Sequence, residues 1–202
     1  MNVTLKKNIL STSPFIPAKA IRVLYWNGER YPSQIIHSSA PLKVRQIYNW
    51  LHKTIKFDDY VFHHLDIWHS RFPWKVIPSG RGVCLDISDV AVYLIREITG
   101  YRCGRVLTSG FEYHGSQFFV HAFTWFAYGG QYFRLSPVPE DSTSQCGIYG
   151  AWSSLAELAT DYLSLCEFTN LSFLPPVFTQ GDSISSLFEQ AKVFYKSSNV
   201  IL

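Results

Sequence analysis

The segment Ser79-Gly80-Arg81-Gly82-Val83-Cys84-Leu85-Asp86-Ile87-Ser88-Asp89 places a cysteine directly after a glycine-rich turn and at the start of an apolar stretch. From Cys84 to about Ile98, apolar residues occupy most faces of a predicted helix, so this helix should be the central buried one. Gly100 follows it in the position where glycine commonly ends a helix. The fold is therefore expected to form around a buried helix that begins at a thiol.

A strand-rich region follows this helix and carries a histidine. Strand patterns are expected at 102–107, 118–127 and 131–135, and Gly129-Gly130 should form a tight hairpin between the last two. His121 lies in the second of these strands. A cysteine at a helix start with a strand histidine downstream is typical of a thiol nucleophile and its general base.

The remaining patterns complete an α+β architecture, with helices first, an antiparallel sheet after them, and the nucleophile helix packed across the sheet. An amphipathic helix of about four turns should open at Pro41, where the missing proline N–H costs nothing. The other expected elements are a strand at 21–26, a return strand at 29–36, and helices near 152–168 and 182–196. The chain is interpreted as one domain over residues 1–202, with a catalytic core at about 41–140 and a C-terminal helical extension at about 150–202.

Composition excludes several classes of protein. Hydrophobic residues make up 47% of the 202 residues and charged residues only 16%, below the ~25% of an average globular chain, so disorder is not expected. The net charge of +3 comes without a basic stripe, which argues against a nucleic-acid partner. The absence of a signal-peptide pattern and of an apolar run near ~20 residues predicts a cytoplasmic protein with no membrane partner.

The sequence offers a weak candidate for a metal site. His63, His64, Asp66 and His69 lie close together in the chain, but their spacing fits no known ligand motif, so we interpret them as solvated or packing residues and expect no metal. The four cysteines, at 84, 103, 146 and 166, contain no C-x-x-C pair, and Cys103 and Cys166 are expected to be small core residues.

The Cys84–His121 pair has a physical basis. The helix macrodipole and the unpaired N–H groups at a helix start favour a thiolate, and an imidazolium would add a full opposite charge. The Cys84 N–H is a candidate oxyanion donor, and Gly82 and Val83 are expected to line the bound substrate, since glycine permits close approach. Each residue alone would usually be structural, but their order along the chain favours catalysis.

These residues resemble the transglutaminase-like superfamily, whose members share a cysteine proteinase fold. Gly82-Val83-Cys84 resembles its G-x-C motif, and His121-Ala122-Phe123 its His-Ala-Trp motif. The segment Gly100–Val106 is similar to the segment that carries a family arginine, with Arg105 in that place. The resemblance covers roughly residues 41–140 and implies a transglutaminase-like or papain-like fold.

One position departs from the family pattern. The third catalytic residue of the family is an Asp before a proline, and Ser136 stands there in this chain. Either Ser136 orients His121 as a neutral partner of a Cys–His dyad, or Glu140 or Asp141 reaches back, or the site is a degenerate binding module. We favour the dyad, because a preformed thiolate–imidazolium pair depends less on a third carboxylate.

The resemblance implies acyl chemistry without a cofactor. Cys84 would attack an amide, peptide or thioester and form an acyl-enzyme, with His121 as general acid and base. Water, an amine acceptor or a carrier protein would then take the acyl group, making the enzyme a hydrolase or an acyltransferase. Trp74 and Phe123 are the aromatic candidates for substrate contacts. The alternative is a catalytically impaired module that binds a partner through an aromatic cleft.

Overall fold

The computed structural model describes residues 35–62, 64, 67–111, 118–136, 147–165, 170–174, 178, 180–183 and 186–187. The strand expected at 21–26 lies outside the described residues, as do most of the return strand at 29–36 and most of the helix at 182–196. Within the described part, no helix has both the length and the apolar character needed to cross a membrane.

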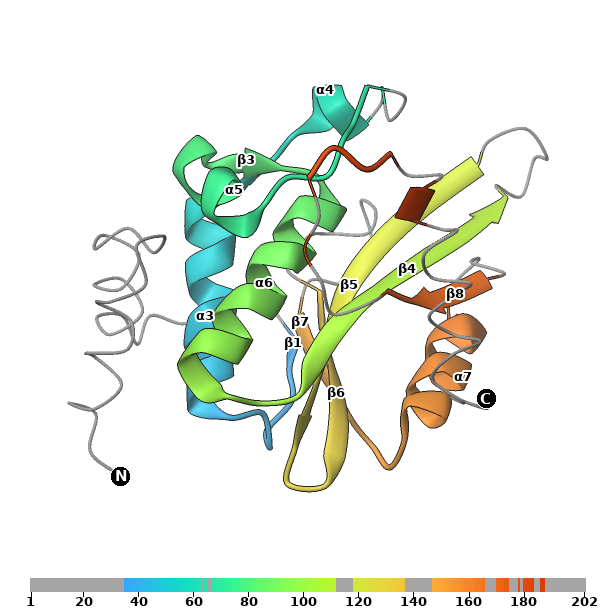
Figure 1. Ribbon diagram of the computed structural model, residues 1–202. Coiled ribbons are helices and arrows are strands. Elements are labelled where there is room, and N and C mark those ends of the chain that lie inside the picture. Colours follow the sequence, from blue (N-terminus) through green and yellow to red (C-terminus); the bar gives the residue numbers. More distant parts are fainter. Residues whose placement is uncertain are drawn as a thin grey trace.

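A six-stranded sheet forms the centre of the molecule, in the order β1-β7-β6-β5-β4-β8 (Figure 1). Its strands are β1 (Ile35–Ile36), β4 (Cys103–Phe111), β5 (Phe118–Tyr128), β6 (Gln131–Ser136), β7 (Gly147–Trp152) and β8 (Asn170–Phe173). All neighbouring pairs are antiparallel except β1 and β7, which run parallel. The hairpin between β5 and β6 turns at Gly129-Gly130, both with positive φ, as the sequence predicted.

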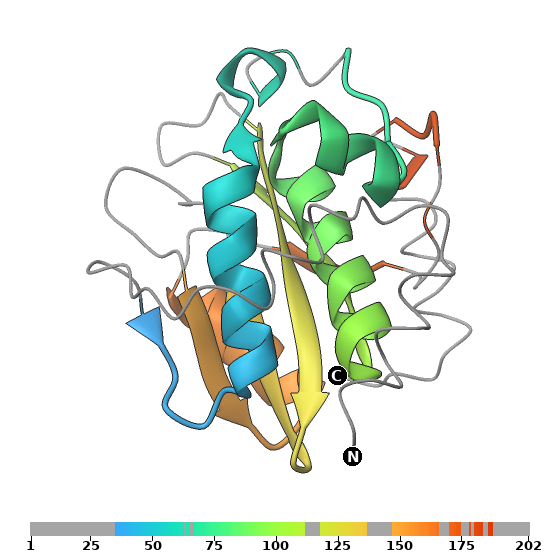
Figure 2. The same cartoon turned by 90° about the vertical axis from the view of Figure 1, so that its left-hand side faces the viewer.

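Helices cover both faces of this sheet. The helices α3 (Leu42–Thr54) and α6 (Cys84–Thr99) lie on one face, and α7 (Leu155–Leu165) lies on the other (Figures 1 and 2). Short elements bridge α3 and α6: β2 (Lys56–Phe57), α4 (Asp59–Phe62), α5 (Pro73–Ser79) and β3 (Arg81–Gly82). The strands β2 and β3 pair in parallel beside the start of α6. The predicted α+β class, with the helix that begins at Cys84 packed on an antiparallel sheet, is confirmed.

Local sequence accounts for the two main helices. In α3 the buried residues are Val44, Ile47, Tyr48, Trp50 and Leu51, which follow the three- and four-residue steps that bury one face of a helix. The helix α6 is buried on nearly every side and ends at Gly100, whose φ of 71° is the left-handed conformation that glycine adopts easily.

The region after the core differs from the helical extension expected there. The strand β7 inserts between β1 and β6, and β8 pairs with β4 at the opposite edge. The helix α7 matches the helix predicted near 152–168. The strand β7 was missed because its sequence, GIYGAW, contains two glycines and no regular alternation, and the four residues of β8 are too few to show a period.

Strand alternation decides which residues meet α6 and which meet α7. Leu107 and Ala122 share a buried cluster with the start of α6. Their neighbours Val106 and Phe123 pack instead with Tyr162 of α7. Because successive side chains of a strand point to opposite faces, every second residue of β4 and β5 belongs to the α7 face.

Candidate active site

Cys84 is the first residue of α6, as the sequence predicted, and it is only 3% exposed. It belongs to a buried cluster that also contains Val83, Leu107, Ala122 and Leu187. The N-cap residue is Val83, whose side chain has no polar atom and makes no capping hydrogen bond. The first N–H groups of α6 therefore receive no acceptor from the residue that usually supplies one.

The buried carboxylate of Asp86 organises the turn in front of Cys84. It accepts hydrogen bonds from the Val83 N–H at 3.0 Å and from Trp68 Nε1 at 3.3 Å. The Arg71 guanidinium adds two more, from Nε at 3.2 Å and Nη2 at 2.7 Å. Sequence reasoning missed this role, although an acid in the third helical position is a known partner of the N-cap N–H.

Position 82 requires glycine, because the Asp86 side chain approaches the Gly82 backbone closely. A Cβ atom on Gly82 would lie 2.7 Å from Asp86 Cβ, closer than such atoms approach in proteins. We expect Gly82→Ala to destabilise the fold by about 1–3 kcal/mol, as overpacking does in a buried site. Urea unfolding would measure this change, and a midpoint equal to that of the parent would show that the turn shifts at no cost.

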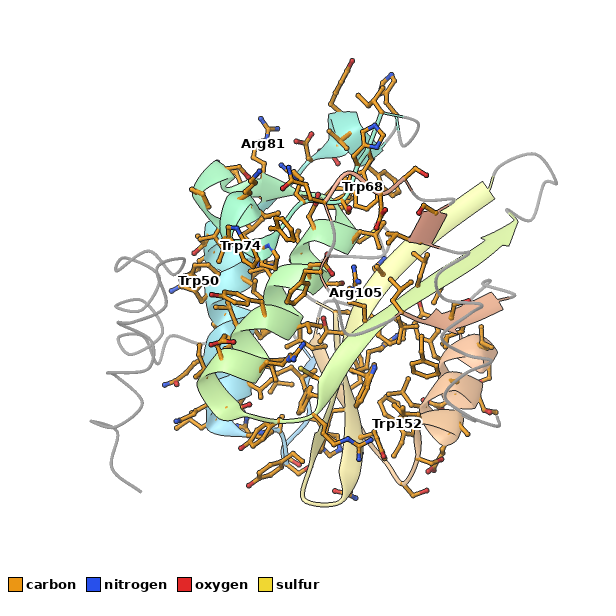
Figure 3. All side chains as sticks on the ribbon, in the orientation of Figure 1. Trp50, Trp68, Trp74, Arg81, Arg105 and Trp152 are labelled. Carbon is orange, nitrogen blue, oxygen red and sulfur yellow. The ribbon has the colours of Figure 1, made fainter. Side chains whose placement is uncertain are left out.

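A second carboxylate of α6 forms a buried ion pair with the sheet. Arg105 Nη1 of β4 donates a hydrogen bond to Asp89 Oδ2 at 3.0 Å and lies 2.8 Å from Oδ1, and both side chains are buried. Figure 3 shows Arg105 between α6 and the strands. Burial raises the pKa of Asp89 to about 7, although the Arg105 charge acts to lower it. The arginine expected from the resemblance therefore connects α6 to the sheet.

His121 and Ser136 lie on the same face of the sheet. His121 is the fourth residue of β5 and is opposite Thr108, whose hydroxyl donates to the His121 carbonyl at 3.1 Å. Ser136 is the last residue of β6, one position beyond the Leu135–Thr124 pair, and is fully buried. Continuing this register places it opposite Phe123 and diagonal to His121, within reach of side-chain interaction. Cys84 shares its cluster with Ala122, which faces α6, whereas alternation turns His121, like Phe123, toward the α7 face. The pairing of the Cys84 thiol with the His121 imidazole therefore stays a prediction that the strand register does not support.

The predicted substrate residues make other contacts in this structure. The Val83 N–H donates to Asp86, and the Gly82 carbonyl accepts from the Asp58 N–H at 3.1 Å. Phe123 is fully buried against Tyr162 of α7. These contacts are structural, so binding of substrate at Gly82, Val83 and Phe123 stays a prediction that they do not support.

Trp74 lies away from the start of α6. Its ring stacks on Phe72 and meets the edge of Tyr93, which is nine residues after Cys84 and therefore about 13 Å further along the helix. Its predicted role in substrate binding is likewise not supported by these contacts.

The histidine group and the other described cysteine have ordinary surroundings. His64 is exposed and stacks on Tyr60, while His63 and Asp66 lie outside the described residues. Among the described residues, no group of three or more His, Cys, Asp or Glu side chains is arranged to hold a metal. Cys103 is buried, as predicted, and burial raises its pKa to about 12. Cys146 and Cys166 lie outside the described residues.

Comparison with known proteins shows what this chain is similar to. None of the curated proteins matches the sequence significantly. Among solved structures, a protein described as a TGase aligns with a TM-score of 0.43 and 12% identity, over 77% of this chain and 35% of its own. A "putative cysteine protease" from Cytophaga hutchinsonii aligns with a TM-score of 0.33 and 16% identity, over 69% of this chain and 47% of its own. This chain thus spans about a third of the first protein and under half of the second. The family model of the transglutaminase-like superfamily matches residues 32–137, more than half of the sequence, and the chain belongs to that superfamily.

Proposed function

We propose that this protein is a cysteine-dependent acyl hydrolase or acyltransferase that acts on an amide, a peptide or a thioester. The observation that carries the proposal is the position of Cys84 at the first residue of α6, behind an N-cap residue that offers no acceptor. The N–H groups of the first turn can then stabilise both the thiolate and the oxygen of a tetrahedral intermediate. Membership of a superfamily that includes transglutaminases and peptidase-like enzymes supports the same chemistry.

In the proposed reaction the Cys84 thiolate attacks the carbonyl carbon, and a C–S bond forms. The bond to the leaving nitrogen or sulfur breaks, and His121 gives the leaving group its proton. His121 then takes a proton from water or an amine as that acceptor attacks the thioester, and the thiolate leaves again. Ser136, diagonal to His121 on the same face of the sheet, would hold the imidazole in place as a neutral hydrogen-bonding partner.

The charges around the start of α6 are compatible with a thiolate. Asp86, two residues after Cys84, would repel it if its own charge were uncompensated. The Arg71 guanidinium pairs with that carboxylate at 2.7 Å. The Asp89 carboxyl is paired with Arg105. Each acidic residue in the first two turns of α6 is therefore paired with an arginine. The positive end of the helix dipole can then stabilise a thiolate at Cys84.

The pH dependence of Cys84 alkylation by iodoacetamide tests the proposal. If Cys84 and His121 form an ion pair, the labelling rate at about pH 6 should keep most of its value at about pH 9, because the thiolate persists below the ordinary thiol range. In His121→Ala the rate should fall at low pH and rise only near the ordinary thiol range. Mass spectrometry of the Cys84 peptide separates this label from that on other cysteines.

Cys103 supplies an internal control, since its raised pKa keeps it neutral and slow throughout this pH range. If parent and His121→Ala proteins show the same profile, rising only near about pH 8.5, Cys84 is an ordinary thiol and the enzyme proposal fails. If the ion pair is present, an added primary amine that intercepts the acyl-enzyme would distinguish a transferase from a hydrolase.

A binding module is the second candidate function. The observation in its favour is that Ser136, which is uncharged, stands where the superfamily places a carboxylate, at a fully buried position. Such a module would keep the fold and lose the charge that stabilises an imidazolium. The same labelling profile decides between the two candidates, because a module of this kind has no need of a reactive thiol.

A further inference from the structure

A few described residues near the C-terminal end of the chain lie beside the proposed active site. The described residues 178, 180–183 and 186–187, here called the C-terminal strap, lie beside α5, α6 and the segment 67–72 (Figure 1). The strap begins at Phe178, whose ring meets the edge of Tyr93 in α6. It ends at Leu187, which is fully buried in the cluster that contains Cys84.

Hydrogen bonds at Ser70 anchor the middle of the strap. The Ser70 N–H donates to the Asp182 carbonyl at 2.8 Å, and the Gly181 N–H donates to the Ser70 carbonyl at 2.9 Å. The Asp182 N–H donates to Ser70 Oγ at 2.9 Å. The exposed Lys75 ammonium adds a bond to the Gln180 side chain at 2.9 Å. These bonds join segments that are more than 100 residues apart in the sequence.

The other end of the strap lies in the same buried cluster as the thiol. Cys84 is 3% exposed and Leu187 is 0% exposed, and Trp68 lies in the same cluster. Figure 3 shows Trp68 beside the strap, at the level where α6 begins. A nucleophile with so little exposed surface cannot meet the carbonyl carbon of a peptide or amide, because that carbon must approach the sulfur closely.

The border of the strap is open to solvent. A pocket of about 360 Å³ lies along it, between Trp68 and Arg71 on one side and Gly181 on the other. The described residues of the strap are joined to the body by the hydrogen bonds at Ser70, by the contact of Phe178 with Tyr93 and by the burial of Leu187. Segments held by few buried contacts open at lower free energy than the core.

We propose that the C-terminal strap is an autoinhibitory cover, in which Leu187 closes the entrance to Cys84 and must leave before an acyl substrate can reach the thiol. This inference rests on the proposed function for the role of the thiol. The site would then be switched by whatever displaces or removes the strap, and catalysis would occur only in the open population.

The test compares two leucine-to-alanine variants of the full-length chain. Leu187→Ala removes the side chain that would close the site. Leu158→Ala is the matched control, because Leu158 is equally buried but lies in α7 on the other face of the sheet. Iodoacetamide labelling at about pH 9, where an ordinary thiol is largely ionised, reports accessibility independently of His121.

We expect Leu187→Ala to raise the labelling rate of Cys84 by about tenfold or more, since the thiol reacts only from the open population. Cys103, buried in a different cluster with the body of α6, should keep its parent rate and reports any general loosening of the fold. In Leu158→Ala the ratio of the Cys84 rate to the Cys103 rate should equal that of the parent.

An unchanged Cys84 rate in Leu187→Ala would overturn the proposal, and so would equal acceleration of Cys84 and Cys103. If Leu187→Ala does not fold, the variant Ser70→Ala tests the proposal instead. It removes the acceptor for the Asp182 N–H and leaves the buried cluster around Cys84 unchanged. It should accelerate Cys84 selectively, and the absence of that effect would overturn the proposal. Leu187→Ala could speed the labelling of Cys84 selectively at about pH 9 while Cys84 stays unreactive at about pH 6. That result would support the autoinhibitory cover and contradict the proposed catalytic function.

Discussion

Replacing Arg105 by leucine should destabilise the protein by about 3–5 kcal/mol at about pH 8, because it leaves the Asp89 carboxylate buried without its cationic partner. Both side chains are buried, with Nη1 within 3.0 Å of the carboxylate oxygens. The pair joins the second turn of α6 to β4, so its loss also weakens the attachment of the nucleophile helix to the sheet.

The effect should depend on pH in a defined direction. The pKa of Asp89 rises from 3.8 to about 7 on folding, so the native state binds more protons than the unfolded state between these values. The contribution of this group to stability therefore falls as pH rises through that range. Without Arg105 the pKa rises further, so Arg105→Leu should lose less stability at about pH 5 than at about pH 8.

Urea unfolding at both pH values would measure this difference. The double variant Arg105→Leu/Asp89→Leu should recover much of the loss, because replacing a whole buried ion pair by apolar groups is often neutral or stabilising. A single variant that loses the same free energy at both pH values would show that Asp89 does not titrate as described. If the double variant is no more stable than Arg105→Leu, the loss of stability in Arg105→Leu comes from packing and not from the unpaired Asp89 carboxylate.

Replacing Asp86 by alanine should have the second large effect, about 3–5 kcal/mol, since three different groups lose one acceptor together. The N–H of Val83 and the indole of Trp68 would be left buried without their carboxylate. Arg71, which is partly exposed, can turn to solvent and should contribute less. Because Asp86 holds the turn before Cys84, its loss should also speed the labelling of Cys84.

Asp59→Ala is the matched control for Asp86→Ala, because it removes one negative charge from an exposed position in the first turn of α4. Its effect on unfolding should stay within about 0.5 kcal/mol, as for ordinary surface substitutions. Equal effects of the two substitutions would show that the Asp86 hydrogen bonds contribute little beyond their charge. Both free energies can be obtained from urea titrations at one pH.

Several elements could be predicted from local patterns. The apolar steps of α3, the all-round burial of α6 and the glycine that ends it are properties of short windows of sequence. The hairpin at Gly129-Gly130 follows from the preference of glycine for positive φ. The elements with weak local signals were missed, namely the short strand β8, the glycine-containing β7, and α5, which contains a proline.

Some residues of the candidate site could likewise be predicted from the sequence, and others could not. The sequence identified Cys84 at a helix start, and the resemblance identified Arg105 and Ser136. It also suggested Phe123 and Trp74 as substrate contacts, but alternation along β5 turns Phe123 toward α7, and Trp74 packs on Tyr93. Each step along a strand reverses the face, so the same alternation turns His121, two residues before Phe123, toward α7. The sequence therefore did not establish that the His121 imidazole meets the Cys84 thiol.

From the sequence alone came the α+β class, the buried helix with a cysteine at its first position, and the superfamily. These depend on periodicity, helix boundaries and motif order, which are encoded within a few neighbouring residues. Only the tertiary structure decided that Asp86 gathers Arg71, Trp68 and Val83, and that Leu187 joins the cluster of Cys84. Such contacts join residues that are far apart in the chain, and their partners are selected by how the helices pack on the sheet, which no local pattern records.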